Sequence, residues 1–208
     1  MTDMPGALAQ PSAHPPMVPR LTEADYSERA VQSGIVDQYI LNSHGDVDGL
    51  YLLDGKQVNF PPHLTMVLTR AVKAGDRIVF RGRQESEHVI RASEITNETT
   101  GEAIRDKPPV RGKSPALPAA PLLSRVPKML VRGTMKALLY GPKGDVNGLL
   151  LSDKTTVRMP PETSFKFVNV FQHGDTISVE GEGCENHFGR CIEASAIGVN
   201  GLPSISVY

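Results

Sequence analysis

The 208-residue sequence has no tryptophan, few other aromatic residues and only two cysteines. Two cysteines cannot supply the disulfide framework of a small secreted protein. A run of about 18 apolar residues, which a membrane-spanning helix needs, is also missing. The N-terminal residues have neither a basic leader nor an apolar core, so they do not form a secretory signal. We therefore expect a soluble cytoplasmic protein.

A surplus of positive charge is absent as well. The chain has 22 Lys and Arg against 23 Asp and Glu, which gives a formal net charge of −1. General polyanion binders usually carry a marked basic excess, so any nucleic-acid site must come from local placement of charge. No nucleophile elbow, phosphate loop or paired metal-ligand motif is present. We expect a non-enzymatic binding protein without a cofactor.

The dominant feature that is present is an internal repeat. Residues 45–62 recur as residues 144–161, with Gly-Asp-Val-[Asp/Asn]-Gly-Leu and Pro-Pro elements in both copies, at a constant separation of 99 positions. The separation becomes 102 beyond Gly82, where residues 90–95 match residues 192–197. The sequence therefore predicts two tandem domains of about 65 to 70 residues. Units this small bury a limited fraction of their surface, so packing between the copies is expected.

The domain boundaries follow from the repeat and from composition. We expect a disordered tail over 1–20, a short helix over 21–32, domain one over 33–97, a basic proline-rich linker over 98–127, domain two over 128–200 and a tail over 201–208. The linker composition favours a semi-stiff spacer, although its positive charges could also clamp a phosphate backbone. The alternating pattern of the final tail could add an edge strand.

Each copy predicts the same order of elements. In copy one, strands are expected at 33–41, 50–53, 57–60, 76–81 and 88–95, with a helix over 63–73. Asp54-Gly55 predicts a two-residue hairpin turn with positive φ. Copy two has Asp153-Lys154 there, so its hairpin should be looser. The apolar face of the helix is predicted to consist of Leu64, Val67, Leu68 and Ala71, with Gly75 as its C-terminal cap.

This order, with a glycine near the start of strand one and a helix between strands three and four, resembles the OB fold. The fold class is therefore expected to be all-β, with one short helix per repeat, as two tandem five-stranded OB-type Greek-key barrels. The repeated elements are similar to bacterial proteins described only as OB-fold nucleic-acid-binding. The resemblance implies a ligand across strands two and three, bordered by loops 42–48 and 82–87 in copy one and by loops 141–147 and 181–189 in copy two.

Alternation along strands two and three predicts which side chains enter the barrels. The inward set is Leu50, Leu52, Val58 and Phe60, with Leu149, Leu151, Val157 and Met159 in copy two. The outward set is Tyr51, Leu53, Gln57 and Asn59, with Leu150, Ser152, Thr156 and Arg158 in copy two.

Single-stranded nucleic acid requires a basic groove and aromatic platforms on which bases stack. Copy one offers both, whereas copy two has Leu150 in place of Tyr51, and Thr176, Glu180 and Glu182 in place of three arginines. The sequence therefore predicts weak, salt-sensitive binding of single-stranded DNA or RNA through repeat one, with a site made of Tyr51, Gln57, Asn59, Arg77, Arg81, Arg83 and Arg91. The same arginines also fit an ordinary solvated face. The alternative function is a structural or adaptor protein that docks another protein through Leu53 and Leu150.

Two further motifs superficially suggest metal binding. Asp46-x-Asp48-Gly49 lacks the remaining calcium ligands, so a turn is expected there. Cys184, His187 and Cys191 give three ligands at a spacing unlike that of zinc sites. We expect no metal, and free thiols at both cysteines.

Overall fold

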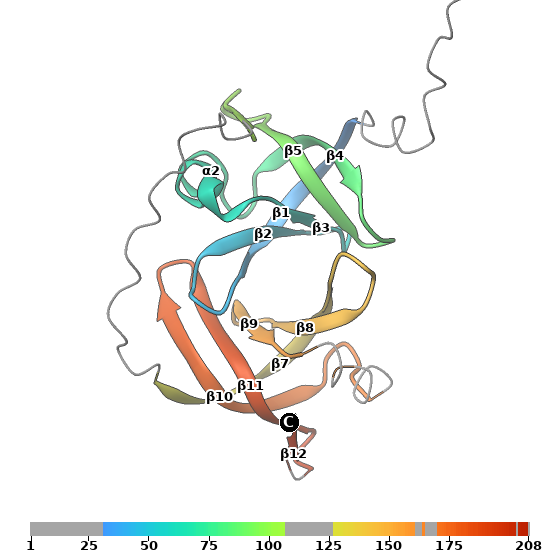
Figure 1. Cartoon of the computed structure of the whole chain (residues 1–208), viewed down its shortest axis with the longest axis vertical. Coiled ribbons are helices and arrows are strands. Elements are labelled where there is room, and N and C mark those ends of the chain that lie inside the picture. The colour runs from blue at the N-terminus through green and yellow to red at the C-terminus, as the bar shows by residue number, and fades with distance from the viewer. Residues whose placement is uncertain (1–30, 107–126, 161–163, 165–169, 203, 208) are drawn as a thin grey trace, which may run out of the picture.

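The computed structural model describes residues 31–106, 127–160, 164, 170–202 and 204–207, which form two β-barrels that lie against each other (Figure 1). The expectations for residues 1–20, 21–30 and 107–126 fall outside these ranges. The first barrel consists of β1 (Val31–Leu41), β2 (Val47–Leu52), β3 (Gln57–Asn59), η1 (Pro62–Leu64), α2 (Thr65–Ala71), β4 (Arg77–Gln84), β5 (Val89–Asn97) and β6 (Ala103–Arg105). The second consists of β7 (Lys128–Tyr140), β8 (Val146–Leu151), β9 (Thr155–Arg158), β10 (Thr176–Asn186), β11 (Gly189–Val199) and β12 (Ile205–Ser206).

Both sheets close in the same way. In the first, β1 pairs with β2 and with β4, β3 pairs antiparallel with β2 and parallel with β5, and β4 pairs with β5. In the second, β7 pairs with β8 and with β10, β9 pairs antiparallel with β8 and parallel with β11, and β10 pairs with β11. This is the five-stranded Greek-key order of the OB fold, and the predicted fold class is confirmed.

The barrel interiors confirm the predicted alternation. All eight residues of the inward set are at most 4% exposed, and they belong to two separate apolar clusters, one in each barrel. Both barrels bend at a β-bulge that follows Arg81 and Glu180. A Cβ at Gly82 would lie 2.2 Å from the Arg91 carbonyl oxygen, and at Gly181 it would lie 2.0 Å from that of Glu193. The repeated glycines therefore allow the close strand approach that closes each barrel.

The helix of the first barrel differs from its predicted form. It starts as one 3₁₀ turn and continues as an α-helix over Thr65–Ala71 only, and its C-cap is Val72, not a glycine. Val67 faces solvent, whereas Thr65 and Thr69 are buried. Their hydroxyl groups donate to the carbonyl oxygens of Val47 and Thr65, at 2.6 and 2.7 Å, so burial leaves no donor unpaired. Most of the equivalent segment of copy two lies outside the described residues.

Each barrel also has a sixth short strand on the outer edge of its last long strand. β12 pairs with β11, so the predicted edge strand in the C-terminal tail is confirmed. β6 pairs with β5 in the same position, and its Ile104 is buried in the core of the first barrel. The first barrel therefore extends beyond residue 97, into the range that the sequence assigned to the linker.

The β2–β3 hairpin is not the predicted two-residue turn. Gly55 donates its N–H to the Leu52 carbonyl at 3.0 Å. In this turn Gly55 has a positive φ of 87°, whereas Asp54 does not have a positive φ. This pattern is typical of a turn followed by one left-handed residue. Lys154 takes the same position in copy two with a φ of 69° and a turn bond of 3.2 Å to Leu151.

A left-handed conformation is costly for lysine and free of steric penalty for glycine. We expect Lys154→Gly to raise the free energy of unfolding by about 1 kcal/mol, and Gly55→Lys to lower it by a similar amount. Urea unfolding of both variants measures the two effects. A destabilised Lys154→Gly variant would contradict the left-handed conformation of Lys154.

Candidate nucleic-acid interface

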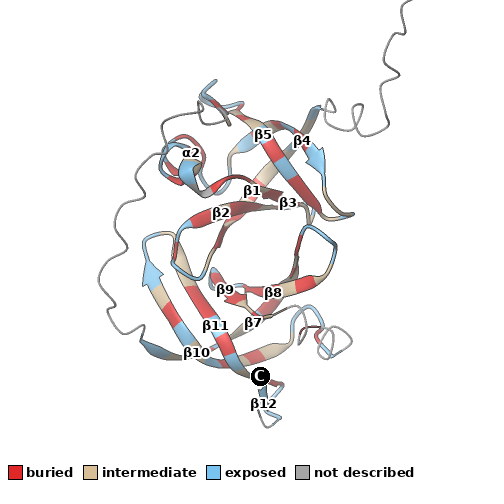
Figure 2. Cartoon of the chain, in the orientation of Figure 1, coloured by how far each residue is buried: buried red, intermediate tan, exposed pale blue. Residues whose placement is uncertain are grey.

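The outer face of β2 and β3, where the OB resemblance implies a ligand, lies against the second barrel (Figure 1). Figure 2 shows buried residues on the facing strands β2, β3, β8 and β9. Ile40, Leu139 and Leu150 form a third apolar cluster there, bordered by Tyr51 and Ala137. Leu150 therefore points out of its own barrel, as predicted, but it is buried between the barrels.

Polar side chains of this face bond across the contact. The Gln57 amide oxygen accepts from the Tyr140 N–H at 2.8 Å, and its NH₂ group donates to the Tyr140 carbonyl at 3.4 Å. Thr156 accepts from the Leu41 N–H at 3.2 Å. Thr156 and Leu41 are the repeat equivalents of Gln57 and Tyr140, so the two barrels face each other with approximate two-fold symmetry. Gln57 is thus almost fully buried and helps to pack the barrels together, and it also borders a hollow at their contact.

An ion pair crosses the same contact. Arg158 donates through Nη2 to both carboxylate oxygens of Asp48, at 3.0 and 3.2 Å, and through Nε to the Leu41 carbonyl at 2.9 Å. Burial raises the pKa of Asp48, and this effect exceeds the lowering by Arg158. Asp48 therefore belongs to the barrel contact, and the expectation that its loop forms a turn fits the positive φ of Gly45.

The hairpin of β10 and β11 adds a second set of contacts. Phe188 packs edge-on against Tyr39, with ring centroids 5.5 Å apart, and Asn186 donates to the Gly45 carbonyl at 2.8 Å. Cys184 and Cys191 are direct cross-strand neighbours and both are free thiols, as expected. Burial raises the pKa of Cys191 to about 12, so this thiol stays protonated. The described residues contain no cluster of His, Cys, Asp or Glu suited to a metal ion.

Tyr51 is half-buried at the mouth of a groove between the barrels. The groove has a volume of about 370 Å³, and its lining includes Tyr51, His88, Lys136 and Tyr140. The rings of His88 and Tyr140 lie 4.6 Å apart and tilted by 30°. Burial, with the nearby Asp37 carboxylate, raises the pKa of Tyr51. Tyr51 therefore lies beside other aromatic rings, although it is not the open platform that the sequence suggested.

The four predicted arginines are exposed on the outer face of β4 and β5. Arg83 and Arg91 are direct cross-strand partners in the antiparallel ladder. Arg77 and Arg83 have carboxylate neighbours, Glu98 at 3.9 Å and Glu85 at 3.4 Å.

Arg81 lies opposite Glu94, but that carboxylate is bonded at 2.8 Å by Arg105 of β6. Within the described residues, neither Arg81 nor Arg91 makes an ion pair. The structure thus brings the predicted arginines together and leaves two of them without a counter-charge.

The arginine face continues into the contact between the barrels. Arg91 and Asn59 are adjacent in the parallel β3–β5 ladder. Both line a hollow of about 260 Å³, together with Tyr140, Asn147 and Arg158. Tyr140, Asn147 and Arg158 come from the second barrel. The sequence placed Arg158 in the outward set and Asn147 in a border loop, but it included none of the three in the predicted site. The signal that could have found them was the apolar Leu150 at an outward position, which indicates that this face is covered.

Comparisons with known proteins add little to this description. No protein-family model and no curated protein matches the chain. Among solved structures, the wild-type single-stranded DNA binding protein from Thermus aquaticus matches at 15% identity over 81% of this chain and 90% of that chain, with a TM-score of 0.27. A deletion mutant of that protein carrying R190A matches at 15% identity over 81% and 92%, with a TM-score of 0.23. The OB assignment therefore rests on the strand order of this chain itself. In the part of the chain that the structure describes, no helix has the length and apolar character to cross a bilayer.

The ion pair across the contact generates a prediction with a definite pH dependence. Arg158→Ala leaves the desolvated Asp48 carboxylate without its donor, and we expect a loss of about 1.5 to 3 kcal/mol in the free energy of unfolding at neutral pH. The pKa of Asp48 should rise further, because Arg158 lowers it in the wild type. A carboxyl group with a higher pKa in the folded state binds protons more tightly there, so stability falls as pH rises from about 4, the unfolded value.

The measurement is urea unfolding of the wild type and Arg158→Ala between about pH 4 and pH 7, a window that begins at the unfolded pKa of an aspartate and extends upward from it. The variant should lose stability more steeply as the pH rises. Asp48→Asn in the Arg158→Ala background is the matched control, because Asn147 is the natural residue at the equivalent position, and it should remove the extra slope. Parallel pH profiles for the wild type and Arg158→Ala would contradict the inferred role of the ion pair.

Proposed function

We propose that the protein binds single-stranded DNA or RNA, weakly and with strong salt dependence, on the outer face of β4 and β5 of the first barrel. The observation that carries the proposal is the direct cross-strand pairing of Arg83 with Arg91. Like charges in directly opposite positions destabilise a sheet. A phosphate between the two guanidinium groups would remove that repulsion and accept charge-assisted hydrogen bonds from both.

The path of such a ligand follows from the positions of the other groups. Phosphates would run from Arg81 to the Arg83–Arg91 pair and then to the hollow that contains Asn59 and Tyr140. Tyr140 also borders the groove with Tyr51 and His88, so a base that leaves the arginine face meets aromatic rings. Each stacked base contributes on the order of 1–3 kcal/mol. Of the predicted site, this path uses Tyr51, Asn59, Arg81, Arg83 and Arg91. It leaves out Arg77, and Gln57 borders the hollow while it holds the barrels together.

The arginine face is tested by Arg81→Glu combined with Arg91→Glu. We expect at least about a tenfold loss of affinity for a fluorescently labelled single-stranded oligonucleotide, because two phosphate contacts become repulsive. Fluorescence anisotropy at low salt measures the change. Lys128→Glu combined with Arg132→Glu, two exposed cations on β7 of the second barrel, changes the net charge by the same amount and should retain most of the affinity. Equal losses in both variants would contradict a localised site.

The salt dependence is a separate prediction. For three phosphate contacts on a single strand, affinity should fall roughly 20-fold between about 50 and 200 mM salt. Anisotropy titrations at several salt concentrations give the slope, and Arg81→Glu/Arg91→Glu should flatten it. An affinity that is the same at both salt concentrations would show that the arginines do not contact phosphates.

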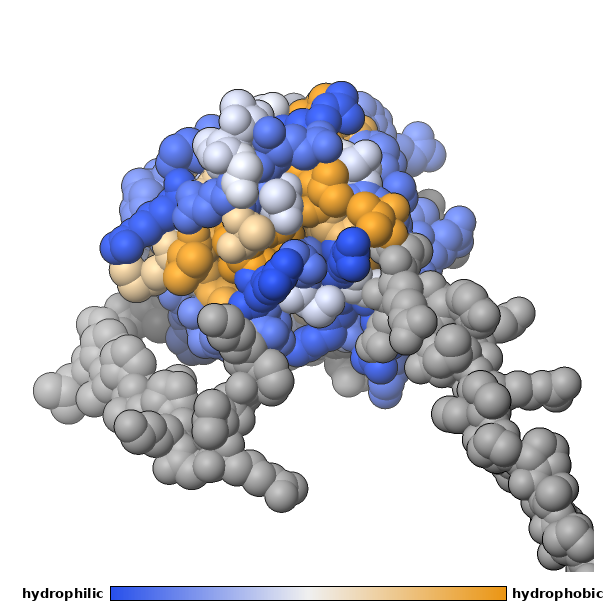
Figure 3. All heavy atoms as spheres, turned by 90° about the horizontal axis from the view of Figure 1, so that it is seen from above, coloured by the Kyte–Doolittle hydropathy of each residue, from blue (hydrophilic) through white to orange (hydrophobic). Residues whose placement is uncertain are grey.

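The adaptor function remains the alternative outcome of the same experiment. One of its two proposed anchors, Leu150, is buried between the barrels. The exposed large apolar residues of the first barrel are Val31, Leu53, Met66 and Val67. Figure 3 shows apolar residues bordered by hydrophilic ones on one side of the molecule. A flat anisotropy trace at low salt would favour a protein partner on such a surface.

A further inference from the structure

The two barrels carry opposite charges at equivalent positions of the same curved face. The basic face consists of Arg81, Arg83 and Arg91, and the acidic face consists of Glu180, Glu182 and Glu193. The strand register is also shared, since Gly82 and Gly181 both follow the bulge, and Ser93 and Ser195 donate to the carbonyl oxygens of Arg81 and Glu180, at 3.2 and 3.0 Å. The backbone supports of the two faces are therefore alike, and their side-chain charges are reversed.

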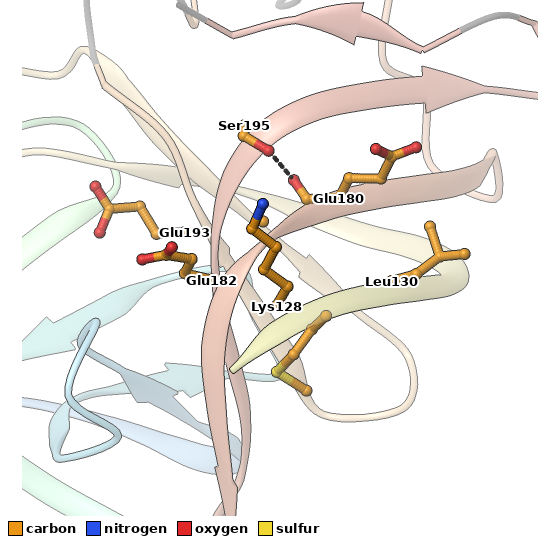
Figure 4. Close-up of a pocket in the computed structure, with 8 residues that line it drawn as sticks. Lys128, Leu130, Glu180, Glu182, Glu193 and Ser195 are labelled. Atoms are coloured by element: carbon orange, nitrogen blue, oxygen red, sulfur yellow. Dashed lines mark hydrogen bonds between the residues drawn. The ribbon is translucent and has the colours of Figure 1, made fainter. Parts of the chain in front are cut away.

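The acidic face is hollowed into a groove. The groove has a volume of about 740 Å³ and runs along β7, β10 and β11. Figure 4 shows Glu182 and Glu193 side by side on one part of it, with Glu180 further along β10 and Leu130 on β7. Glu180 and Glu182 place two exposed carboxylates beside the single amine of Lys128, so these groups leave a negative excess in the groove. Leu130 is 75% exposed, which gives the groove an uncovered apolar edge.

The two faces cannot meet within one molecule. The barrels contact each other through β1–β3, β7–β9 and the tip of the β10–β11 hairpin, whereas β4–β5 and the groove along β7, β10 and β11 lie on opposite outer sides (Figure 1). A contact between the basic face and the acidic face therefore requires two molecules. Such a contact is heterologous, because each molecule offers a different surface to its neighbour.

We propose that the acidic groove of the second barrel binds the basic face of the first barrel of another copy of this chain. The partner is a second copy because the same chain supplies exposed guanidinium groups on a face of matching strands. Their charge is opposite in sign to the exposed Glu180 and Glu182 carboxylates of the groove. Arginine–carboxylate pairs are short, charge-assisted and often bidentate. The uncovered edge at Leu130 would meet Val31, its repeat equivalent, which is also exposed at the border of the basic face.

The proposal goes beyond nucleic-acid binding and predicts competition with it. The carboxylates of the acidic groove would occupy the arginines that hold phosphates in the proposed function. Each assembly has one open basic face at its end, and a nucleic acid can still bind there. At all remaining basic faces, the nucleic acid and the second copy exclude each other. Exposed charge pairs are screened by salt, with a Debye length of about 10 Å at 0.1 M, so the association should be weak and confined to low salt.

Sedimentation velocity without nucleic acid tests the self-association. The wild type should associate at about 10 mM salt and be monomeric at about 300 mM. Glu180→Arg/Glu182→Arg and Arg81→Glu/Arg83→Glu should each weaken self-association at least tenfold. An equimolar mixture of these two variants should form a one-to-one complex, because the first keeps the basic face and the second keeps the acidic groove.

Three results would overturn the proposal: a monomeric wild type at low salt, a monomeric mixture of the two variants, or a variant that associates as the wild type does. Circular dichroism of both variants confirms that these exposed substitutions leave the fold intact. Oligonucleotide binding by Glu180→Arg/Glu182→Arg tests the proposed function separately from self-association, because this variant keeps every arginine of the basic face. This variant should still bind the labelled oligonucleotide, and adding an unlabelled oligonucleotide to the associated wild type should return it to monomers.

Discussion

The structure depends on the contact in which the outer faces of β1–β3 and β7–β9 cover each other. Each barrel alone would expose an apolar patch at this face, and the contact buries Ile40, Leu139 and Leu150 in one cluster. It also satisfies polar groups, since Gln57 bonds both the N–H and the carbonyl of Tyr140. Small barrels bury a limited fraction of their own surface, so packing against a second copy supplies stability that each lacks alone. The surface used for this packing is the one where an OB domain usually holds its ligand.

The sequence predicted the interior of each barrel and not the contact between them. The period of two along β2 and β3 assigned all eight inward residues correctly, because each barrel core requires that alternation. The same period assigns Leu150 and Thr156 to the outside of their barrel, but it contains no information on what lies outside. Of the predicted helix face, Leu68 and Ala71 are buried and Val67 is exposed. The inner face also includes two buried threonines, which the apolar spacing could not indicate and whose hydroxyl groups are bonded. The arginines could be grouped from sequence, but the missing counter-charge of Arg81 depends on Arg105 binding Glu94, a contact between strands that only the fold brings together.

Duplication within one chain permits an asymmetry that a symmetric dimer cannot have. Asp48 and Arg158 form an ion pair across the approximate two-fold axis, while Asn147 and Asn59 occupy the equivalent positions on the other side. In a symmetric dimer each substitution would appear twice, so a carboxylate would be matched by a second carboxylate near the axis. The outer faces diverged further, to arginines in one barrel and glutamates in the other, over strands whose bulge and supporting serine bonds stayed the same. The backbone was thus constrained by barrel closure while the exposed charges were free to change sign.

The energetics of the contact decide where a ligand can bind. To use the outer face of β2 and β3 in the usual OB manner, the barrels would have to separate and expose the three apolar residues of the shared cluster. Full exposure of three such side chains costs about 5 to 9 kcal/mol, before the loss of the Gln57 and Arg158 hydrogen bonds is counted. This is comparable with the total stability of a typical domain, and a stacked base returns only on the order of 1–3 kcal/mol. A ligand that binds β4 and β5 incurs none of this cost, because that face is already open to solvent. The barrel contact itself therefore favours the proposed binding on the arginine face over binding on the usual OB face.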